Sequence, residues 1–331
     1  MKVLVTGSGG FIGSHLTNFL LNSGIEVLGI DNYNNYYAPT YKRLRFENVV
    51  GEHINFKSWE LDLCDYKKTR EIINDFSPDS VIHLAGQAGV RLPKEQNFKY
   101  IESNITAFCN VLDATINQGV KSFLYASSSS VYGNSKEFPL SEDTINLQPI
   151  SFYGSTKLAN EFLASKLSNS AETNILGMRF FSVYGPWGRP DMAYFKIVRA
   201  LYTGTQFNIF GSGSQIRDMT HVWDVVKTVS LLQDKNLSDP LTAPNIVNIG
   251  GGHPHSLRKL IETLEIASGL NLKQKTNPAS ELDVIRTEAD FSRLHNMINF
   301  KPKIDIEQGS QSLVEWASEA LVLKNLKNWS E

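Results

Sequence analysis

The 331-residue sequence has few cysteines, little net charge and no long apolar run. Cys64 and Cys109 are too few for a disulfide framework or a cysteine-based metal site, and we expect both to be small buried core residues. No stretch reaches the roughly 18 apolar residues that a membrane span needs. The net charge of −2, with dispersed basic residues, predicts neither a nucleic-acid nor a membrane partner.

Two further absences concern targeting and metals. Residues 1–5 lead directly into a strand-like run, which leaves no room for a signal peptide and predicts a cytoplasmic protein. The seven histidines form no cluster with ligand spacing, so no metal is expected. The run His253-Pro254-His255 is interpreted as a loop.

The first half of the chain alternates short apolar runs with helix-like stretches, which predicts a parallel sheet built from βαβ units. The expected strands are residues 2–6, 26–30, 55–61, 80–84, 122–126 and 175–180. Residues 13–22 and 98–117 carry apolar residues at helical spacing. After Gly185, glycines and prolines divide the chain into shorter pieces, with helices expected at 193–202, 222–233 and 257–268, which predicts a smaller lobe.

A glycine-rich turn follows the first expected strand and opens a helix: Gly7, Ser8, Gly9, Gly10, Phe11, Ile12 and Gly13. In that context backbone amides at a helix N-terminus can bind a pyrophosphate. Asp31 ends the second strand about 20 residues later, where a carboxylate accepts hydrogen bonds from a ribose diol and repels a 2′-phosphate. NAD is therefore favoured over NADP. The basic residues Lys42, Arg43 and Arg45 are interpreted as a solvated helical face.

A second group of reactive side chains lies in the middle of the chain. Tyr153 and Lys157 are one helical turn apart and share a helix face. Four serines, residues 127–130, follow an expected strand at its carboxyl end, where ligands bind in open α/β sheets.

These motifs resemble, in kind and order, those of the extended short-chain dehydrogenases, the NAD-dependent epimerase/dehydratase family. The resemblance also includes residues 83–86 and Arg217-Asp218, and it spans nearly the whole chain. It implies an α/β fold with a Rossmann-type doubly wound parallel sheet and a smaller mixed α/β substrate-binding lobe. The expected NAD-binding domain is 1–180, with 219–250 returning to it, and the expected lobe is 181–218 plus 251–331.

The resemblance also implies site residues. Tyr153 is the expected base, Lys157 and the nicotinamide ring favour its phenolate, and Ser128 shares the proton with a sugar hydroxyl. A tyrosine needs this help because its ordinary pKa is near ~10. The expected NAD contacts are Gly7, Gly10, Phe11, Ile12, Gly13, Asp31, Asn32, Asp62, Leu63, Leu84, Ala85, Gly86, Asn104, Tyr153, Lys157 and Phe180.

Within the family, the residue before Val131 separates reactions. Dehydratases and UDP-glucuronate decarboxylases carry a glutamate there, whereas this chain has Ser130, which leaves 4-epimerisation as the expected reaction. Residues 179–195, 31–37 and 87–91 resemble the UDP-glucuronate 4-epimerases in particular. Ser182 fits the hydroxyl that those enzymes carry where galactose-type epimerases have asparagine. A UDP-sugar partner follows: UDP-glucuronate and UDP-galacturonate.

The substrate residues that the resemblance implies have distinct tasks. Arg217, assisted by Arg189, is expected at the diphosphate. Residues 208–210 are expected to hold uracil mainly through backbone groups. The full expected set is Arg91, Ser128, Ser129, Ser130, Ser182, Arg189, Asn208, Phe210, Arg217 and Asp283. One departure lies beside it, because Glu281-Leu282 replaces the usual Pro-Gly of the uronate enzymes.

Two alternatives remain open from the sequence. The first is a 4-epimerase of neutral or N-acetylated UDP-hexoses. The second is a catalytically idle NAD-sensing protein, against which the intact Ser128, Tyr153 and Lys157 argue. The long helices at 98–117 and 153–167 suit the helical homodimer of the family.

Overall fold

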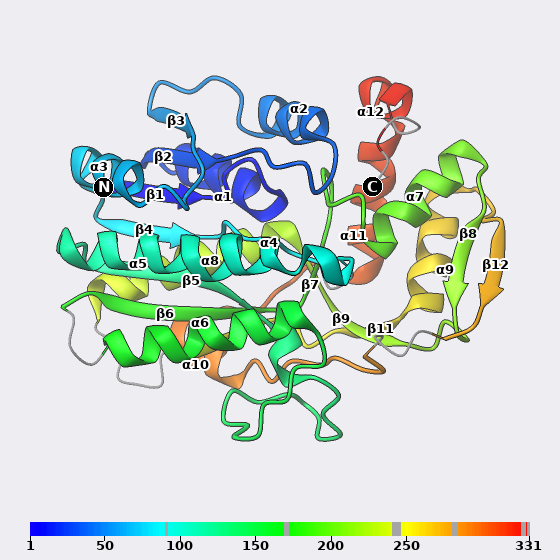
Figure 1. Ribbon diagram of the computed structural model, residues 1–331. Coiled ribbons are helices and arrows are strands. Elements are labelled where there is room, and N and C mark those ends of the chain that lie inside the picture. Colours follow the sequence, from blue (N-terminus) through cyan, green and yellow to red (C-terminus); the bar gives the residue numbers. More distant parts are fainter. Residues whose placement is uncertain (90–91, 169–171, 240–245, 280–283, 326–328, 330–331) are drawn as a thin grey trace.

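The computed structural model describes residues 1–89, 92–168, 172–239, 246–279, 284–325 and 329, apart from the side chains of residues 168, 320, 321 and 323. A parallel sheet of seven strands dominates it, in the order β10-β6-β5-β4-β1-β2-β3 (Figure 1). Its strands are β1 (Lys2–Thr6), β2 (Glu26–Asp31), β3 (Phe56–Glu60), β4 (Ser80–His83), β5 (Ser122–Ser128), β6 (Asn174–Phe180) and β10 (Ile246–Ile249). The predicted α/β fold class is confirmed, and each of the six expected strands is present with ends shifted by two residues at most.

Helices cover both faces of this sheet because its central strands are apolar on both sides. Alternate residues of β1 point to different cores: Val3 and Val5 pack in one, and Leu4 packs in the other. The first core includes α1 (Phe11–Asn22), α2 (Pro39–Val49) and α8 (Val222–Ser238), and the second includes α3 (Tyr66–Phe76), α5 (Ala107–Asn117) and α6 (Phe152–Ser168).

The expected helix at 98–117 is continuous but not uniform. It comprises α4 (Phe98–Tyr100), a π-helical segment (Ile101–Thr106) and α5. Segments of π-helix often mark functional positions. Asn104, an expected NAD contact, lies in this one.

The smaller lobe lies to the right of the main sheet in Figure 1. It holds a sheet in the order β11-β9-β7 and the pair β12-β8. Its elements are β7 (Ser182–Tyr184), α7 (Ala193–Thr203), β8 (Phe207–Phe210), β9 (Ile216–His221), β11 (Pro254–Ser256), α9 (Leu257–Ser268), β12 (Gln274–Asn277), α11 (Ile306–Ser318) and α12 (Ala320–Asn325). The remaining helix, α10 (Ser292–Ile298), packs on α8 and β10.

Two local expectations are wrong. His255 lies in β11 and pairs with Arg217 of β9, so 253–255 is not simply a loop. Cys64 and Cys109 are half-buried and unpaired with each other rather than fully buried, and burial raises the pKa of Cys64 to about 12. Within the described ranges, no helix combines the length and apolarity that a membrane crossing requires.

Candidate active site

The glycine turn lies at the carboxyl edge of the sheet. Thr6, the last residue of β1, pairs with His83 of β4, so Gly7 and residues 84–86 emerge side by side. Gly7 has a φ of +73°, and a Cβ there would lie 2.8 Å from the Ala85 nitrogen. The neighbouring loop is fixed by Thr6, whose Oγ1 accepts from the Ala85 N–H at 3.2 Å. Only glycine permits this close approach of two backbones.

The start of α1 fits a dinucleotide diphosphate. Gly10 is the N-cap residue, and no side chain caps the helix. The first amides of a helix have no intrahelical acceptor, so those of Phe11, Ile12 and Gly13 are suited to bind an anion. A Cβ on Gly13 would overlap the carbonyl of Gly7, which keeps the turn tight.

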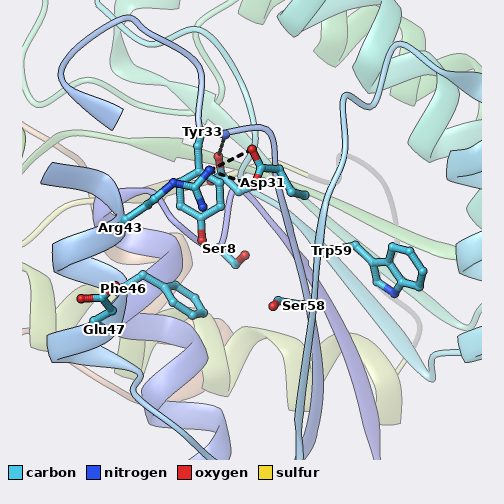
Figure 2. Close-up of a pocket in the computed structure, with 9 residues that line it drawn as sticks. Ser8, Asp31, Tyr33, Arg43, Phe46, Glu47, Ser58 and Trp59 are labelled. Atoms are coloured by element: carbon cyan, nitrogen blue, oxygen red, sulfur yellow. Dashed lines mark hydrogen bonds and ion pairs between the residues drawn. The ribbon is translucent and has the colours of Figure 1, made fainter. Parts of the chain in front are cut away.

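Asp31 is held ready for hydrogen-bond donors. Its carboxylate accepts from the Gly9 N–H at 3.0 Å and from the Tyr33 N–H at 2.8 Å. A carboxylate offers about four acceptor positions, so positions remain for two ribose hydroxyls. A cavity of about 240 Å³ adjoins it, and Figure 2 shows Arg43 over the Tyr33 ring beside Asp31. Arg43 is paired with Glu60 at 2.8 Å.

The predicted solvated face on α2 is wrong for two of its three residues. Arg43 is half-exposed, but Lys42 and Arg45 are buried. Lys42 donates to the backbone and side-chain oxygens of Asn34, each at 2.7 Å, and burial lowers its pKa to about 8. Helical spacing placed these residues together, but Lys42 is held by the preceding loop and Arg45 by the carbonyls of residues 187 and 188, far away in the sequence.

The other expected NAD contacts lie around the same edge. Asn32 accepts from the Asn34 N–H at 3.1 Å, and Asp62 accepts from the Cys64 N–H at 2.9 Å. Leu63 is buried. Phe180 ends β6 directly beside Ser128 of β5, which puts it next to the serine run.

Ser128, Tyr153 and Lys157 come together where β5 meets α6. The Lys157 Nζ lies 5.9 Å from the centre of the Tyr153 ring and donates to the Ala126 carbonyl at 2.9 Å. Ser128 is close enough to Tyr153 for its hydroxyl to lower the pKa of the tyrosine. Its Oγ donates to the Ser130 Oγ at 3.1 Å. This trio can accept, hold and return one proton.

Burial dominates the acid–base behaviour of the trio. It raises the pKa of Tyr153, while the hydrogen bond to Ser128 and the charge of Arg189 oppose that rise. Burial lowers the pKa of Lys157 to about 8. Without a bound ligand, Tyr153 is therefore held as the neutral phenol. Positive charge beyond that of the protein's own side chains is needed to favour the phenolate.

Asn104 joins the glycine side of the site to α6. Its Oδ1 accepts from the Gln87 N–H at 2.7 Å, and its Nδ2 donates to the Thr156 Oγ1 at 3.0 Å. A Cβ on Gly86 would lie 2.9 Å from the Asn104 Oδ1 and 3.3 Å from the Lys157 Nζ. Residue 86 must therefore be small for Lys157 to take this position.

Sequence reasoning missed a buried ion pair behind the trio. Arg179 of β6 donates to Glu161 of α6 at 2.9 and 2.8 Å, and the Ser127 Oγ donates to the same carboxylate at 2.5 Å. Glu161 continues the helical face of Tyr153 and Lys157 by one more turn, and that spacing was the available signal. The pair fixes β5, β6 and α6 relative to one another.

Arg189 is brought close to the trio from the loop after β7. Its guanidinium makes a two-point contact with Asp191, with an Nε to Oδ1 distance of 3.0 Å, and the Tyr36 hydroxyl donates to the same carboxylate at 3.1 Å. Burial works against its charge, but Asp191 outweighs burial and raises the pKa of Arg189. Ser129 and Ser130 follow Ser128 in a 3-10 helix, and Ser182 begins β7.

The remaining substrate residues lie further out. Arg217 is on β9 and donates to the Ile216 carbonyl at 2.9 Å, while Asn208 and Phe210 have exposed side chains on β8. All three lie on strands of the smaller lobe, whereas the trio lies on β5 and α6. Arg91 and Asp283 lie outside the described residues. No group of three or more His, Cys, Asp or Glu side chains within the described ranges is placed to hold a metal ion.

Fold and site together define a dinucleotide-binding enzyme built on a Rossmann-like parallel sheet. The chain belongs to the NAD dependent epimerase/dehydratase family, whose model matches residues 3–250. It is similar to a UDP-glucuronate 4-epimerase from Thermodesulfobacterium geofontis, with 37% identity over 98% of both chains.

Solved structures give the same family. The chain is similar to the UDP-glucuronic acid 4-epimerase of Bacillus cereus in complex with UDP-glucuronic acid and NAD, at 30% identity and a TM-score of 0.87, over 98% of this chain and 100% of that one. It is also similar to a UDP-glucose 4-epimerase of Thermotoga maritima with UDP-glucose, at 27% identity and a TM-score of 0.86, over 97% and 100% of the two chains.

Proposed function

We propose that this chain interconverts UDP-glucuronate and UDP-galacturonate by inverting C4 through a transient 4-keto sugar. The observation that carries the proposal is the meeting of Ser128, Tyr153 and Lys157 at the carboxyl edge of the sheet, beside a hydroxyl at Ser130. A base and a hydroxyl relay support oxidation at C4. The absence of a carboxylate at position 130 gives no support to elimination or decarboxylation.

The chain's own residues handle the proton. Tyr153 Oη takes it from the C4 hydroxyl through Ser128 and returns it after the ketone has turned over. NAD, when bound at the glycine turn and Asp31, supplies a hydride acceptor that gives the same hydride back. Arg189 supplies positive charge that favours the phenolate. Lys157, whose Nζ lies 5.9 Å from the centre of the Tyr153 ring, adds its own charge when it is protonated.

The substrate carboxylate must be held still, because the 4-keto intermediate is a β-keto acid that loses CO2 readily. Decarboxylation is fastest when the breaking bond aligns with the carbonyl π system. We assign Ser129, Ser130 and Ser182 to fixing the carboxylate away from that alignment. Ser129 and Ser130 follow Ser128 in the 3-10 helix, and Ser182 begins the strand that follows Phe180, the β-sheet partner of Ser128; these placements support the assignment.

The two lobes divide the ligands between them. We assign NAD to residues 1–180 with 219–250, and the UDP-sugar to 181–218 with 251–331. The seven-stranded sheet supports the first assignment, since β10 returns to it. Arg217, Asn208 and Phe210 on the lobe strands support the second.

The decisive experiment is incubation of the purified protein with UDP-glucuronate, followed by separation of the hexuronate products. UDP-galacturonate should form without added oxidant. Absorbance at the wavelength of reduced NAD should not rise in proportion to product, because the cofactor ends unchanged. A stoichiometric rise would contradict epimerisation.

The second candidate is a 4-epimerase of neutral or N-acetylated UDP-hexoses. The likeness to the Thermotoga maritima UDP-glucose 4-epimerase favours it. A panel of UDP-glucose, UDP-N-acetylglucosamine and UDP-glucuronate separates the two, since the proposed function predicts turnover of the uronate alone. Turnover of none of them would favour a non-catalytic NAD-binding protein.

We also propose a cytoplasmic homodimer. The helical face made by α4, the π-helical segment and α6 carries exposed apolar side chains, which support burial against a second copy. Those side chains are Phe98, Ile101, Phe162, Leu163 and Leu167. Cell fractionation and sedimentation test the two parts of the proposal.

A further inference from the structure

Arg45 is a fully buried cation whose partners carry no formal negative charge. Its guanidinium makes four hydrogen bonds within the described structure, all to carbonyl or phenol oxygens. The acceptors are the carbonyls of Trp187 at 2.6 Å, Gly188 at 3.1 Å and Gly9 at 3.1 Å, and the Tyr37 hydroxyl at 2.9 Å. Buried charges are usually paired with opposite charges, so this arrangement needs a reason.

One end of the arrangement is the dinucleotide turn. The Gly9 N–H donates to Asp31, and the Gly9 carbonyl accepts from Arg45. Gly9 is therefore clamped between the carboxylate that faces the ribose and the buried guanidinium. Any ligand that fixes the turn also fixes the Arg45 side chain.

The other end is the loop that carries Arg189. Trp187 has a φ of 56°, in the left-handed region, and a side chain at Gly188 would overlap Tyr194. The Gly188 carbonyl also accepts from the Tyr41 hydroxyl at 2.8 Å. An otherwise unfavourable loop conformation is thus held mainly by donors from α2. Arg189 follows directly, and its charge acts on Tyr153.

We propose that Arg45 is a positioning residue that couples the dinucleotide site to the sugar-nucleotide site. The inference rests on the proposed function, because it needs both ligands. NAD at the glycine turn fixes the Gly9 peptide and, through its carbonyl, the Arg45 guanidinium. The guanidinium then holds the carbonyls of Trp187 and Gly188, and this positions the next residue, Arg189, for contact with the substrate. The diphosphate of NAD would also bring negative charge to the turn whose Gly9 carbonyl accepts from Arg45, and the four acceptors of Arg45 carry no charge of their own.

Coupling of this kind is reciprocal, so it is measurable on either ligand. If Arg45 only supported the fold, its replacement would lower the stability of the protein or the affinities for both ligands. Binding of one ligand would then not change the affinity for the other. The distinguishing quantity is therefore the ratio of NAD dissociation constants measured without and with UDP-glucuronate. A lysine at position 45 keeps the charge but has no planar fork that reaches both loops.

The experiment uses the purified holoenzyme in a Tyr153→Phe background, which prevents turnover. Equilibrium dialysis against graded NAD, with and without saturating UDP-glucuronate, gives the ratio. We expect about a tenfold ratio with Arg45 and less than about threefold with Arg45→Lys. Asn48→Ala is the control on the same helix, since its exposed side chain donates back to the Leu44 carbonyl of α2 and does not line the cavity beside Asp31, and it should keep the full ratio.

A ratio near one with Arg45 intact, or an unchanged ratio in Arg45→Lys, overturns the coupling. If Arg45→Lys does not fold, amide hydrogen exchange on the unmodified chain decides. Removal of NAD should then speed exchange at 187–192 as well as at 7–13, and a change confined to 7–13 overturns the proposal. Failure of the proposed function would give a different result. A chain that binds neither NAD nor UDP-glucuronate yields no dissociation constants, so no ratio can be calculated.

Discussion

Tyr153 is buried beside two cations, yet burial is the larger influence on its hydroxyl. A phenol stored in this way becomes a base only when the site around it is complete. Proton transfer by Tyr153 can therefore be lost while ligand binding is kept. A substitution that removes only the hydroxyl oxygen of Tyr153 tests this.

Tyr153→Phe removes the proton acceptor and leaves the ring in place. We expect kcat to fall about 10²- to 10⁴-fold, the usual contribution of a positioned general base. NAD retention should be unchanged, as measured by cofactor released on denaturation. Tyr202→Phe is the control, because that hydroxyl bonds the Val314 carbonyl away from the trio. Near-normal turnover of Tyr153→Phe would move the chemistry to another group.

Ser182→Ala tests whether hydroxyls restrain the substrate carboxylate. Loss of a hydrogen bond to a charged group costs about 1.5–3 kcal/mol, so the KM for UDP-glucuronate should rise about tenfold or more. Mass spectrometry should also detect more UDP-4-keto-pentose relative to UDP-galacturonate, most of all with Ser130→Ala added. Ser318→Ala, at the end of α11, should change neither value. Wild-type affinity and product ratio in the double variant would show that these serines have another task.

At the scale of single elements, α1 contains a histidine, His15, that burial keeps neutral. Burial lowers the pKa of His15 to about 3, and its ring packs against Trp223 of α8. The unfolded chain, with an ordinary pKa near 6.5, binds this proton more readily. The contribution of the neutral His15 ring to the free energy of unfolding is therefore complete above pH 6.5 and is lost as the pH falls toward 3.

His15→Gln should therefore reduce the acid sensitivity of the fold. At pH 5 the histidine lowers the free energy of unfolding by about 2 kcal/mol relative to neutral pH. Urea unfolding at pH 7 and pH 5 should show that difference shrinking by about this amount in the variant, whatever its absolute stability. His295→Gln, on the exposed part of α10, is the control. An unchanged difference in His15→Gln would mean that the ring is already charged in the folded protein.

Elements could be predicted from the sequence where a local pattern determines them. The central strands β1 and β4 of the main sheet are buried and largely apolar, whereas the edge strand β3 is mostly exposed. The turn at Gly7 needs glycine for local steric reasons. The buried position of Arg45 could not be predicted, because the carbonyls that accept from it belong to residues far away in the sequence. That of Lys42 depends on how the loop at Asn34 folds back on α2. His255 was likewise misjudged, since a three-residue strand exists only through its partner β9.

The same distinction applies to the site. The sequence placed Ser128, Tyr153 and Lys157 on adjoining elements, and the fold brings them together. It gave no sign that Arg189 reaches the tyrosine, because that approach depends on how the lobe folds back. Whether each predicted ligand contact forms stays a prediction.

For the whole molecule, the apolar helical face predicts a dimer that charge can disrupt. Phe162 and Leu163 on α6 are exposed, and burial of such side chains in a symmetric contact contributes about 1.5–3 kcal/mol each. Phe162→Glu with Leu163→Glu should give a monomer at micromolar concentration in sedimentation velocity. Ile266→Glu, an equally exposed apolar position on α9, should leave the dimer intact. A dimer that survives the double substitution uses another surface.

The position of β10 has a consequence for how the protein is made. The six other strands of the sheet are complete once Phe180 has been synthesised, but β10 pairs with β6 only after Ile249. During the intervening synthesis the nascent chain presents an open strand edge, with a row of unpaired backbone groups that invites pairing with another chain. Ribosomes that stall while they translate the smaller lobe should therefore release aggregation-prone fragments. Chaperones that bind unfolded chains should be needed most between the synthesis of Phe180 and that of Ile249.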